Sequence, residues 1–176
     1  MKADITLFGE TRCHKTRFYQ NTLKELGVAY DLAEVDKDTD AAKALTELTG
    51  SASKFPTFLI KGKKVRNPTI ANLEKELARA GIFDPGLVHD EKSQRFVRYM
   101  RPADAFASYS WQGELMVVGH IEISTRLRES GLGTRFATEL LEQLEEADHD
   151  VRLTCPFLRK VAQTRRAWHD KFNLKG

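Results

Sequence analysis

The sequence predicts a mixed α/β (α+β) protein built from two small domains. Strand and helix patterns alternate over residues 4–82, extended patterns dominate residues 95–123, and turn residues lie between these regions. A chain of 176 residues is long enough for one medium domain or two small ones, so the number of domains has to be inferred from the pattern along the sequence. We therefore expect domains at residues 1–83 and 94–176, joined by a linker at residues 84–93.

The composition is that of an ordinary globular protein. Apolar residues make up 41% of the chain, and 28 basic against 25 acidic residues give a formal net charge of +3. This near balance argues against nucleic acid as a partner. The chain has no run of roughly 18 apolar residues, as a membrane span requires, and no apolar stretch of a signal peptide. We expect a soluble, cytoplasmic protein without a membrane partner, whose oligomeric state stays open.

The first domain is predicted to have the element order βαβαββα. Alternating apolar residues indicate the strands, and Gly27, Gly50 and Gly81 stand where helices should end. The expected elements are a strand at 4–8, a helix from 13 to about 26, a strand at 30–35, a helix from about 39 to 49, strands at 55–60 and 64–66, and a helix from about 68 to 81.

The second domain is predicted to be a mixed sheet with two helices. An antiparallel meander of three strands at 95–101, 105–111 and 114–123 comes first. The helices are indicated by apolar residues that share one face, and a strand at 151–154 lies between them. The first helix carries Phe136, Leu140, Leu141 and Leu144, and the last carries Val161, Arg165 and Trp168.

Cys13 is the main candidate for chemistry in the first domain. It lies at the predicted start of a helix, where unpaired N–H groups and the helix dipole favour a thiolate. Arg12 and Lys15 flank it and act in the same direction. The other cysteine, Cys155, is far away in the sequence, so we expect two reduced thiols. An inert cysteine is the alternative at both positions.

The order of elements around Cys13 carries a family resemblance. Cys13 follows the first strand of a βαβαββα chain, and Phe55-Pro56 introduces the third strand. Residues 3–82 thereby resemble glutaredoxins, within the thioredoxin superfamily. The resemblance implies a thioredoxin-like fold and a cis peptide before Pro56. It also implies that the Phe55 backbone faces Cys13 and pairs with a bound thiol compound. A strand-opening proline without this role is the alternative.

The motif Cys13-His14-Lys15-Thr16 departs from the Cys-Pro-x-Cys form common in that family. Without a second thiol in the motif, the dithiol cycle cannot run there. The resemblance therefore implies monothiol chemistry, in which Cys13 attacks a mixed disulfide and a separate small thiol completes the turnover. Thr16 either hydrogen-bonds the thiolate or is a plain helix hydroxyl.

The segment before the last helix of this domain also departs from the family. The usual glycine pair is replaced by Arg66-Asn67-Pro68-Thr69, which resembles the mycoredoxin-like branch. The co-substrate therefore stays open between glutathione and another low-molecular-weight thiol, and a protein disulfide is a further possible partner. Thr69, at a helix start, is a candidate to bind the carboxylate of such a thiol.

A glycine motif in the second domain is a candidate anion site. Arg128-x-x-Gly131-x-Gly133-Thr134 lies between a strand and an amphipathic helix, and its glycines allow close approach to backbone N–H groups. Such a loop suits a pyrophosphate, although an ordinary turn before a helix has the same composition.

Three motifs together resemble the GNAT acetyltransferase superfamily, in its small GNAT-like subgroup, over residues 94–173. They are the glycine motif, His120-Ile-Glu-Ile123 before it, and Cys155-Pro-Phe-Leu158 after the next strand. The resemblance implies binding of acetyl-CoA or CoA, with backbone groups from Ile123 to Thr134, Leu132 included, holding pantetheine and pyrophosphate.

Acetyl transfer to an amine needs a base, or a nucleophile that first takes the acetyl group. His120 and Glu122 share one face of a strand and are candidates for the base or for a substrate anchor. Cys155 is a candidate acyl acceptor, or a resolving thiol for Cys13. A structural histidine and a buried cysteine are the alternatives. No metal site is expected.

The sequence thus predicts a monothiol glutaredoxin-like oxidoreductase fused to a GNAT-like domain that binds CoA and transfers an acetyl group to an unknown acceptor. Mixed disulfides that contain CoA are a further candidate substrate for Cys13. The alternative is a non-catalytic protein that binds or senses CoA and carries a redox or interaction domain.

Overall fold

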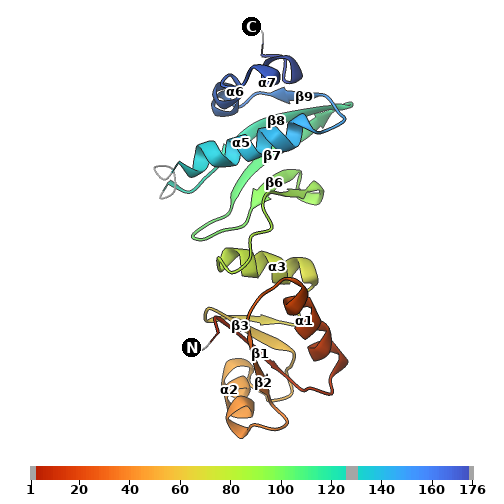
Figure 1. Cartoon of the computed structure of the whole chain (residues 1–176), viewed down its shortest axis with the longest axis vertical. Coiled ribbons are helices and arrows are strands. Elements are labelled where there is room, and N and C mark those ends of the chain that lie inside the picture. The colour runs from red at the N-terminus through yellow and green to blue at the C-terminus, as the bar shows by residue number, and fades with distance from the viewer. Residues whose placement is uncertain (1–2, 126–130, 175–176) are drawn as a thin grey trace. The chain divides into compact units, whose positions relative to one another are not determined.

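The computed structural model describes residues 3–125 and 131–174 and divides the chain into two compact units, Met1–Asp84 and Pro85–Gly176. Each unit has its own sheet, with four strands in the first and five in the second. The predicted fold class is confirmed, because a thioredoxin-like unit of sheet and helices precedes a second sheet with helices (Figure 1).

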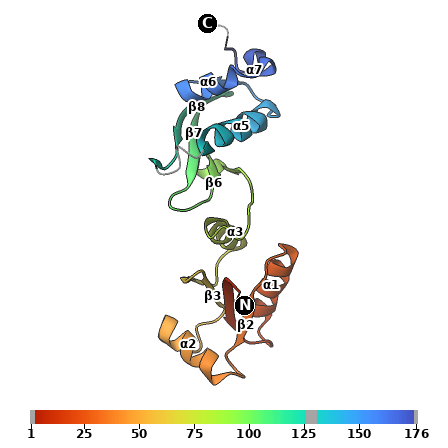
Figure 2. The same ribbon diagram turned by 60° about the vertical axis from the view of Figure 1, so that its left-hand side comes forward.

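The first unit is a sheet of order β2-β1-β3-β4 with helices on both faces (Figure 2). β1 pairs in parallel with β2 and antiparallel with β3, which in turn pairs antiparallel with β4. The element order βαβαββα is the predicted one. The strands are β1 (Ile5–Gly9), β2 (Asp31–Glu34), β3 (Thr57–Ile60) and β4 (Lys63–Arg66), and the helices are α1 (His14–Glu25), α2 (Thr39–Thr49) and α3 (Ile70–Arg79).

The core of the first unit lies between the sheet and the pair α1 and α3. Side chains that point to one face of β1 and β3 meet the apolar stripes of these two helices. α2 lies on the other side of the sheet from α1 (Figure 2). The fully buried members of the core include Ile5, Leu7, Leu23, Phe58, Leu73 and Leu77.

The hairpin between β3 and β4 is tighter than predicted. Lys61 and Gly62 both have positive φ, at 44° and 83°, which is the backbone of a two-residue turn whose twist matches that of paired strands. Lys63 therefore pairs with Ile60 as the first residue of β4 rather than lying in the turn.

The second unit is a sheet of order β5-β6-β7-β8-β9. Neighbouring strands are antiparallel except β8 and β9, which are parallel because α5 connects them. The strands are β5 (Val88–Asp90), β6 (Arg95–Arg98), β7 (Ala105–Gln112), β8 (Leu115–Glu122) and β9 (Val151–Leu153), with the 3-10 turn η1 (Glu91–Ser93) and the helices α5 (Leu132–Glu145), α6 (Pro156–Ala162) and α7 (Arg166–Lys171).

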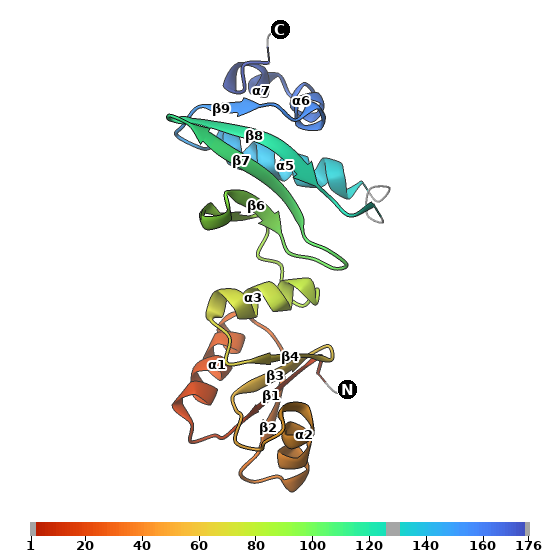
Figure 3. The same ribbon diagram turned by 180° about the vertical axis from the view of Figure 1, so that it is seen from behind.

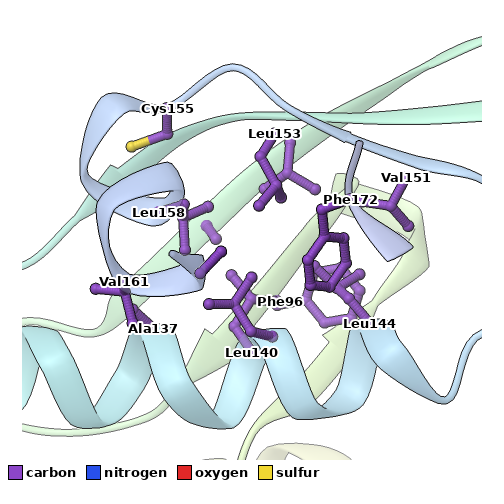
Figure 4. Packing of buried hydrophobic residues seen from close by; sticks show 14 of the residues in the cluster. Phe96, Ala137, Leu140, Leu144, Val151, Leu153, Cys155, Leu158, Val161 and Phe172 are labelled. Atoms are coloured by element: carbon purple, nitrogen blue, oxygen red, sulfur yellow. The ribbon is translucent and has the colours of Figure 1, made fainter. Parts of the chain in front are cut away.

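One face of this second sheet is covered by α5, α6 and α7. The apolar stripe of α5 packs on Phe96 and the inward residues of β7, β8 and β9 (Figure 4). Trp168 of α7 is buried in the same core, and its indole N–H donates to Glu145 at 2.8 Å. The buried positions of α5 are Phe136, Ala137, Leu140, Leu141 and Leu144.

Two details of the second unit differ from the prediction. Residues 84–93, interpreted as linker, contain β5 and η1, and β5 pairs with β6. A three-residue strand is too short to produce a recognisable alternation. The single last helix is instead α6 followed by α7. The Thr164 hydroxyl donates to the Val161 carbonyl at 2.7 Å, and the backbone of Arg165 is extended. The helix is therefore interrupted between α6 and α7 although no Gly or Pro stands there.

Gly9, at the end of β1, is required because α1 passes very close to it. A Cβ at this position would lie 2.4 Å from the Thr16 hydroxyl oxygen and 2.6 Å from the Thr16 methyl group. Thr16 is completely buried and has no room to move away. We expect Gly9→Ala to destabilise the first unit by about 1–3 kcal/mol, measured by urea unfolding.

The double variant Gly9→Ala/Thr16→Ala is the control for that prediction. It removes both of the closest atoms, so it should recover part of the stability that the single change loses. Equal stability of wild type and Gly9→Ala would contradict the packing described here.

Candidate functional sites

The first candidate site is Cys13 at the N-terminus of α1. β1 ends at Gly9, and the Cys13 N–H donates to the Glu10 carbonyl at 3.0 Å, so a tight turn delivers the cysteine to the helix start. Cys13 is the N-cap residue, with extended backbone and no side-chain capping bond. It is partly exposed and not in a disulfide. Its sulfur therefore lies beside unpaired helix amides while staying accessible.

The local groups favour the thiolate of Cys13. Partial burial raises the pKa of the thiol, but the Thr16 backbone N–H, the Thr16 hydroxyl and the Lys15 backbone N–H lower it by more, and Glu10 opposes them weakly. The net result is a pKa below the ordinary value for cysteine. Backbone amides at a helix start are fixed in direction, which makes this stabilisation independent of side-chain motion.

Thr16 is the buried partner in this arrangement. Its hydroxyl oxygen is shielded from solvent and has no hydrogen-bond partner among the residues that the structure describes. The same hydroxyl is one of the groups that lower the pKa of the Cys13 thiol. A buried hydroxyl without a hydrogen-bond partner destabilises the folded protein. Cys13 lies one helical turn before Thr16, so a Cys13 thiolate would be an acceptor for this hydroxyl.

The sheet brings Phe55-Pro56 to the same edge as the Cys13 turn. β1 and β3 are antiparallel with Phe8 opposite Thr57, so the end of β1 and the start of β3 coincide. The peptide bond between Phe55 and Pro56 is cis, as the resemblance implied. The role of the Phe55 backbone in binding a thiol compound stays a prediction.

Asn67 takes the place of the expected glycine pair at this edge. Its φ of 41° is in the left-handed region, which asparagine tolerates better than most residues. Its N–H donates to the Pro56 carbonyl at 3.0 Å, and the Tyr19 hydroxyl donates to the Pro68 carbonyl at 2.5 Å. Thr69 caps α3 by accepting from the Asn72 N–H at 3.3 Å, so its oxygen already has a structural use.

A polar cluster beside the Cys13 turn was not foreseen from the sequence. The Thr11 hydroxyl donates to Glu34, and the Lys37 ammonium lies 2.7 Å from the same carboxylate oxygen. The hydrogen bond from Lys37 is the main cause of the lowered pKa of Glu34. Arg12 and Lys15 are exposed. The cluster ties the turn to the end of β2, and no sequence motif indicated it.

The second candidate site lies where β8 and β9 separate. They pair as far as Val118 and Leu153, and the Thr154 N–H still donates to the Val118 carbonyl at 3.0 Å. On its other edge β8 shifts register, since Val118 faces Tyr109 but His120 faces Ser108. The extra residue, Gly119, is a bulge that turns the end of β8 away from β9.

A pocket of about 330 Å³ opens at this separation. It gathers most of the residues predicted to contact CoA together with Cys155, and it adds two that the sequence did not indicate, Ile121 and Phe157. The lining residues are Ile121, Ile123, Gly131, Gly133, Thr134, Cys155 and Phe157. Ile121 and Phe157 both lie inside motifs quoted above, but the sequence alone does not distinguish an apolar pocket residue there from a core residue.

The N-terminus of α5 forms one wall of this pocket. Gly131 is its N-cap with φ of 74°, and among the described residues no side chain caps the helix. Its first amides are thus candidates to hold an anion. Leu132 is partly buried and packs against the core. Arg128 lies outside the described residues.

Cys155 and the pair His120 and Glu122 are placed differently. Cys155 is 8% exposed at the edge of the core, and Figure 4 shows its sulfur directed away from the labelled core side chains. His120 and Glu122 alternate with the pocket residue Ile121, so they lie on the opposite face of β8. They are well exposed, and their side chains approach to 3.7 Å.

Residues 3–125 and 131–174 lack both a metal-binding cluster and a membrane-spanning helix. No group of three or more His, Cys, Asp or Glu side chains is arranged to hold a metal ion. In the same part of the chain, every helix is too short or too polar to cross a membrane.

Comparison with known families assigns both units. The glutaredoxin family model matches residues 5–65, and the family model described as GCN5-related N-acetyl-transferase matches residues 95–171. The chain therefore contains a glutaredoxin-like domain and a GNAT-like acetyltransferase domain. No curated protein matches the chain significantly.

Similar solved structures include a mutant of the thioredoxin-like protein BC3987, which is 28% identical, with 42% of this chain and 94% of that chain covered and a TM-score of 0.39. Wheat glutaredoxin is 25% identical, with coverages of 37% and 63% and a TM-score of 0.33. A buckwheat glutaredoxin–glutathione complex is 24% identical, with coverages of 45% and 71% and a TM-score of 0.34.

The lowered pKa of Cys13 predicts its pH profile. Only the thiolate is alkylated, so the rate should rise with pH and reach half its maximum below the pH at which a free cysteine does. In Thr16→Val the pKa should rise only in part, since the Thr16 and Lys15 amides remain, and the rate at pH 7 should fall severalfold. The measurement is iodoacetamide labelling followed by intact mass.

The labelling is done in a Cys155→Ser background, so that the adduct reports Cys13 alone. A Cys13 profile that coincides with that of free cysteine would show that the helix amides do not stabilise the thiolate.

Proposed function

We propose that the protein is a monothiol thiol–disulfide oxidoreductase fused to a CoA-binding acetyltransferase, with Cys13 as the nucleophile of the first activity. The observation that carries the proposal is the placement of Cys13 at an uncapped helix start with a lowered pKa. The pocket beside α5 supports the second activity. A cytoplasmic location fits both activities.

In the first activity, the Cys13 thiolate attacks one sulfur of a mixed disulfide. A bond forms between Cys13 and that sulfur, and the other sulfur leaves as a thiolate. A low-molecular-weight thiol, either glutathione or another, then attacks the new disulfide and releases the Cys13 thiolate. The exposed Arg12 and Lys15 attract a thiol that carries carboxylates. Phe55, Pro56 and Thr69 border its binding position.

In the second activity, acetyl-CoA binds in the pocket with its pyrophosphate at the start of α5. The backbone of Leu132, Gly133 and Thr134 would supply N–H groups, and Ile123 would lie along the pantetheine. The amine nitrogen of the acceptor attacks the thioester carbon and loses a proton, and CoA leaves as its thiol.

Acetyl transfer could follow two routes. In one, a base takes the proton of the amine, and in the other, a cysteine first takes the acetyl group. His120 and Glu122 are exposed on the sheet face opposite the helices, so they would serve an amine that approaches from that face. Cys155 lines the pocket itself and would accept the acetyl group as a thioester before passing it to the amine.

A non-catalytic protein that binds or senses CoA is the second candidate function. The observation that favours it is that neither His120 nor Glu122 lines the pocket. Incubation with acetyl-CoA followed by intact mass separates the possibilities. An acetyl adduct that disappears in Cys155→Ser indicates the thioester route. CoA binding without turnover of any amine tested indicates the non-catalytic function.

The oxidoreductase activity is tested by Cys13→Ser. Reduction of a small mixed disulfide by glutathione or another thiol should fall at least a hundredfold, because a hydroxyl is a far poorer nucleophile than a thiolate at neutral pH. The rate of disulfide reduction is followed by the release of a coloured thiol. Cys155→Ser should retain the rate, and equal activity of Cys13→Ser and wild type would exclude Cys13 as the nucleophile.

CoA binding is tested by Gly133→Ala. The new Cβ would meet Ile123 and Phe157 at ordinary contact distances of 3.5 and 3.6 Å, so folding should be unaffected. Alanine also favours the helix by about 1 kcal/mol, which should keep or raise the thermal stability. The methyl group nevertheless narrows the pocket beside the α5 amides, so calorimetry should show CoA affinity reduced at least fivefold. If Gly133→Ala binds CoA as tightly as the wild type, CoA does not bind in the pocket beside α5.

A further inference from the structure

A second pocket in the GNAT-like unit is unexplained by either activity. It has a volume of about 540 Å³ and lies between the β7–β8 hairpin and the segment before β9. Figure 3 shows these two segments side by side, at the opposite end of the sheet from the start of α5. Its lining residues are Trp111, Gly113, Glu114, Asp148, His149 and Asp150.

Three carboxylates border this pocket without ion-pair partners. None of Glu114, Asp148 and Asp150 has a basic side chain within 4.0 Å among the described residues. Asp150 also borders a neighbouring groove that contains Arg152 and Lys171. Glu114 and Asp148 therefore contribute the least compensated negative charge of the pocket, and they attract a cation.

The aromatic side of the pocket suits an organic cation. Trp111 is 43% exposed, although a large apolar side chain is usually covered. The His149 ring stands edge-to-face on it at 5.0 Å, and Tyr109 supports it from the strand at 6.0 Å. The His149 Nε2 atom is buried and has no hydrogen-bond partner among the described residues. An indole fixed beside carboxylates binds a cation through its π face.

We propose that this pocket binds the ammonium group of a primary amine, either a free polyamine or a lysine side chain of a peptide. The indole of Trp111 provides a cation–π contact, and Glu114 and Asp148 provide the opposite charge. An inorganic metal ion is disfavoured, because the described residues contain no cluster of three metal-ligating side chains.

This site is separate from the proposed CoA pocket. β8 runs from Leu115, next to the amine pocket, to Ile121, which lines the CoA pocket. Six residues of strand span about 20 Å. A ligand with several amino groups can place one ammonium group in the amine pocket while the rest of it extends along β8 toward the CoA pocket. The proposal stands on its own contacts and does not require that acetyl transfer occurs.

The experiment titrates the full-length protein with spermidine and, in a second arm, with a short lysine-rich peptide at low ionic strength. Tryptophan fluorescence is the first readout, because Trp111 is exposed whereas Trp168 is 1% exposed. Calorimetry is the second. We expect Trp111→Leu to weaken binding about two- to fivefold and Glu114→Gln/Asp148→Asn to weaken it about tenfold.

The matched control is Glu25→Gln/Glu47→Gln, which removes two exposed carboxylates from the first unit and should leave the affinity unchanged. Thermal unfolding checks that each variant folds, and the carboxylate pair tests the proposal even if Trp111→Leu does not fold. If only spermidine or only the peptide binds, that result identifies the source of the amine. Binding that is absent, equal in the control and test pairs, or displaced by millimolar Mg²⁺ or Ca²⁺ would overturn the proposal.

Discussion

Both candidate sites depend on one constraint, which is that the first amides of a helix have no partner inside the helix. In α2 and α3 a side chain satisfies them, since Asp38 and Thr69 accept from nearby N–H groups. In α1 and α5 the N-cap residue, Cys13 or Gly131, makes no side-chain capping bond. The N-cap residues of α6 and α7 make no side-chain capping bond either, so an uncapped start does not by itself mark a site. The starts of α1 and α5 differ in what surrounds them, since a partly exposed cysteine lies at the first and a pocket at the second.

The sheets determine what surrounds those helix starts. In the first unit, the antiparallel pairing of β1 and β3 brings the cis Phe55–Pro56 peptide to the edge where β1 leads into α1. In the second unit, the bulge at Gly119 lies where β8 and β9 stop pairing. The space between the two strands beyond that point is the pocket that Ile121, Ile123 and Phe157 help to line. Both sites thus arise where strand pairing ends, because the chain there still carries backbone groups that the ladder does not use.

The candidate residues could be predicted to different extents. Residues within one motif, such as Cys13 and Thr16 or Gly131 and Gly133, lie close together whatever the tertiary structure, because helix geometry fixes their spacing. The arrival of Cys155 at the pocket of the glycine motif was an expectation of the resemblance, and the structure brings them together. Ile121, Phe157 and the cluster of Thr11, Glu34 and Lys37 had no usable signal. Their roles depend on partners distant in the sequence.

The sequence by itself determined the fold class, the order of the elements and the position of Cys13 at a helix start, because these follow from local periodicity and capping. Only the tertiary structure decided that residues 88–90 form a strand, that the last helix is two helices, and that His120 and Glu122 lie on the sheet face away from the pocket. The strand and the face of His120 and Glu122 depend on which strand pairs with which and where a ladder shifts register, and such pairing is set by contacts between distant residues. The division of the last helix accompanies the burial of Trp168, whose indole N–H donates to Glu145 of α5.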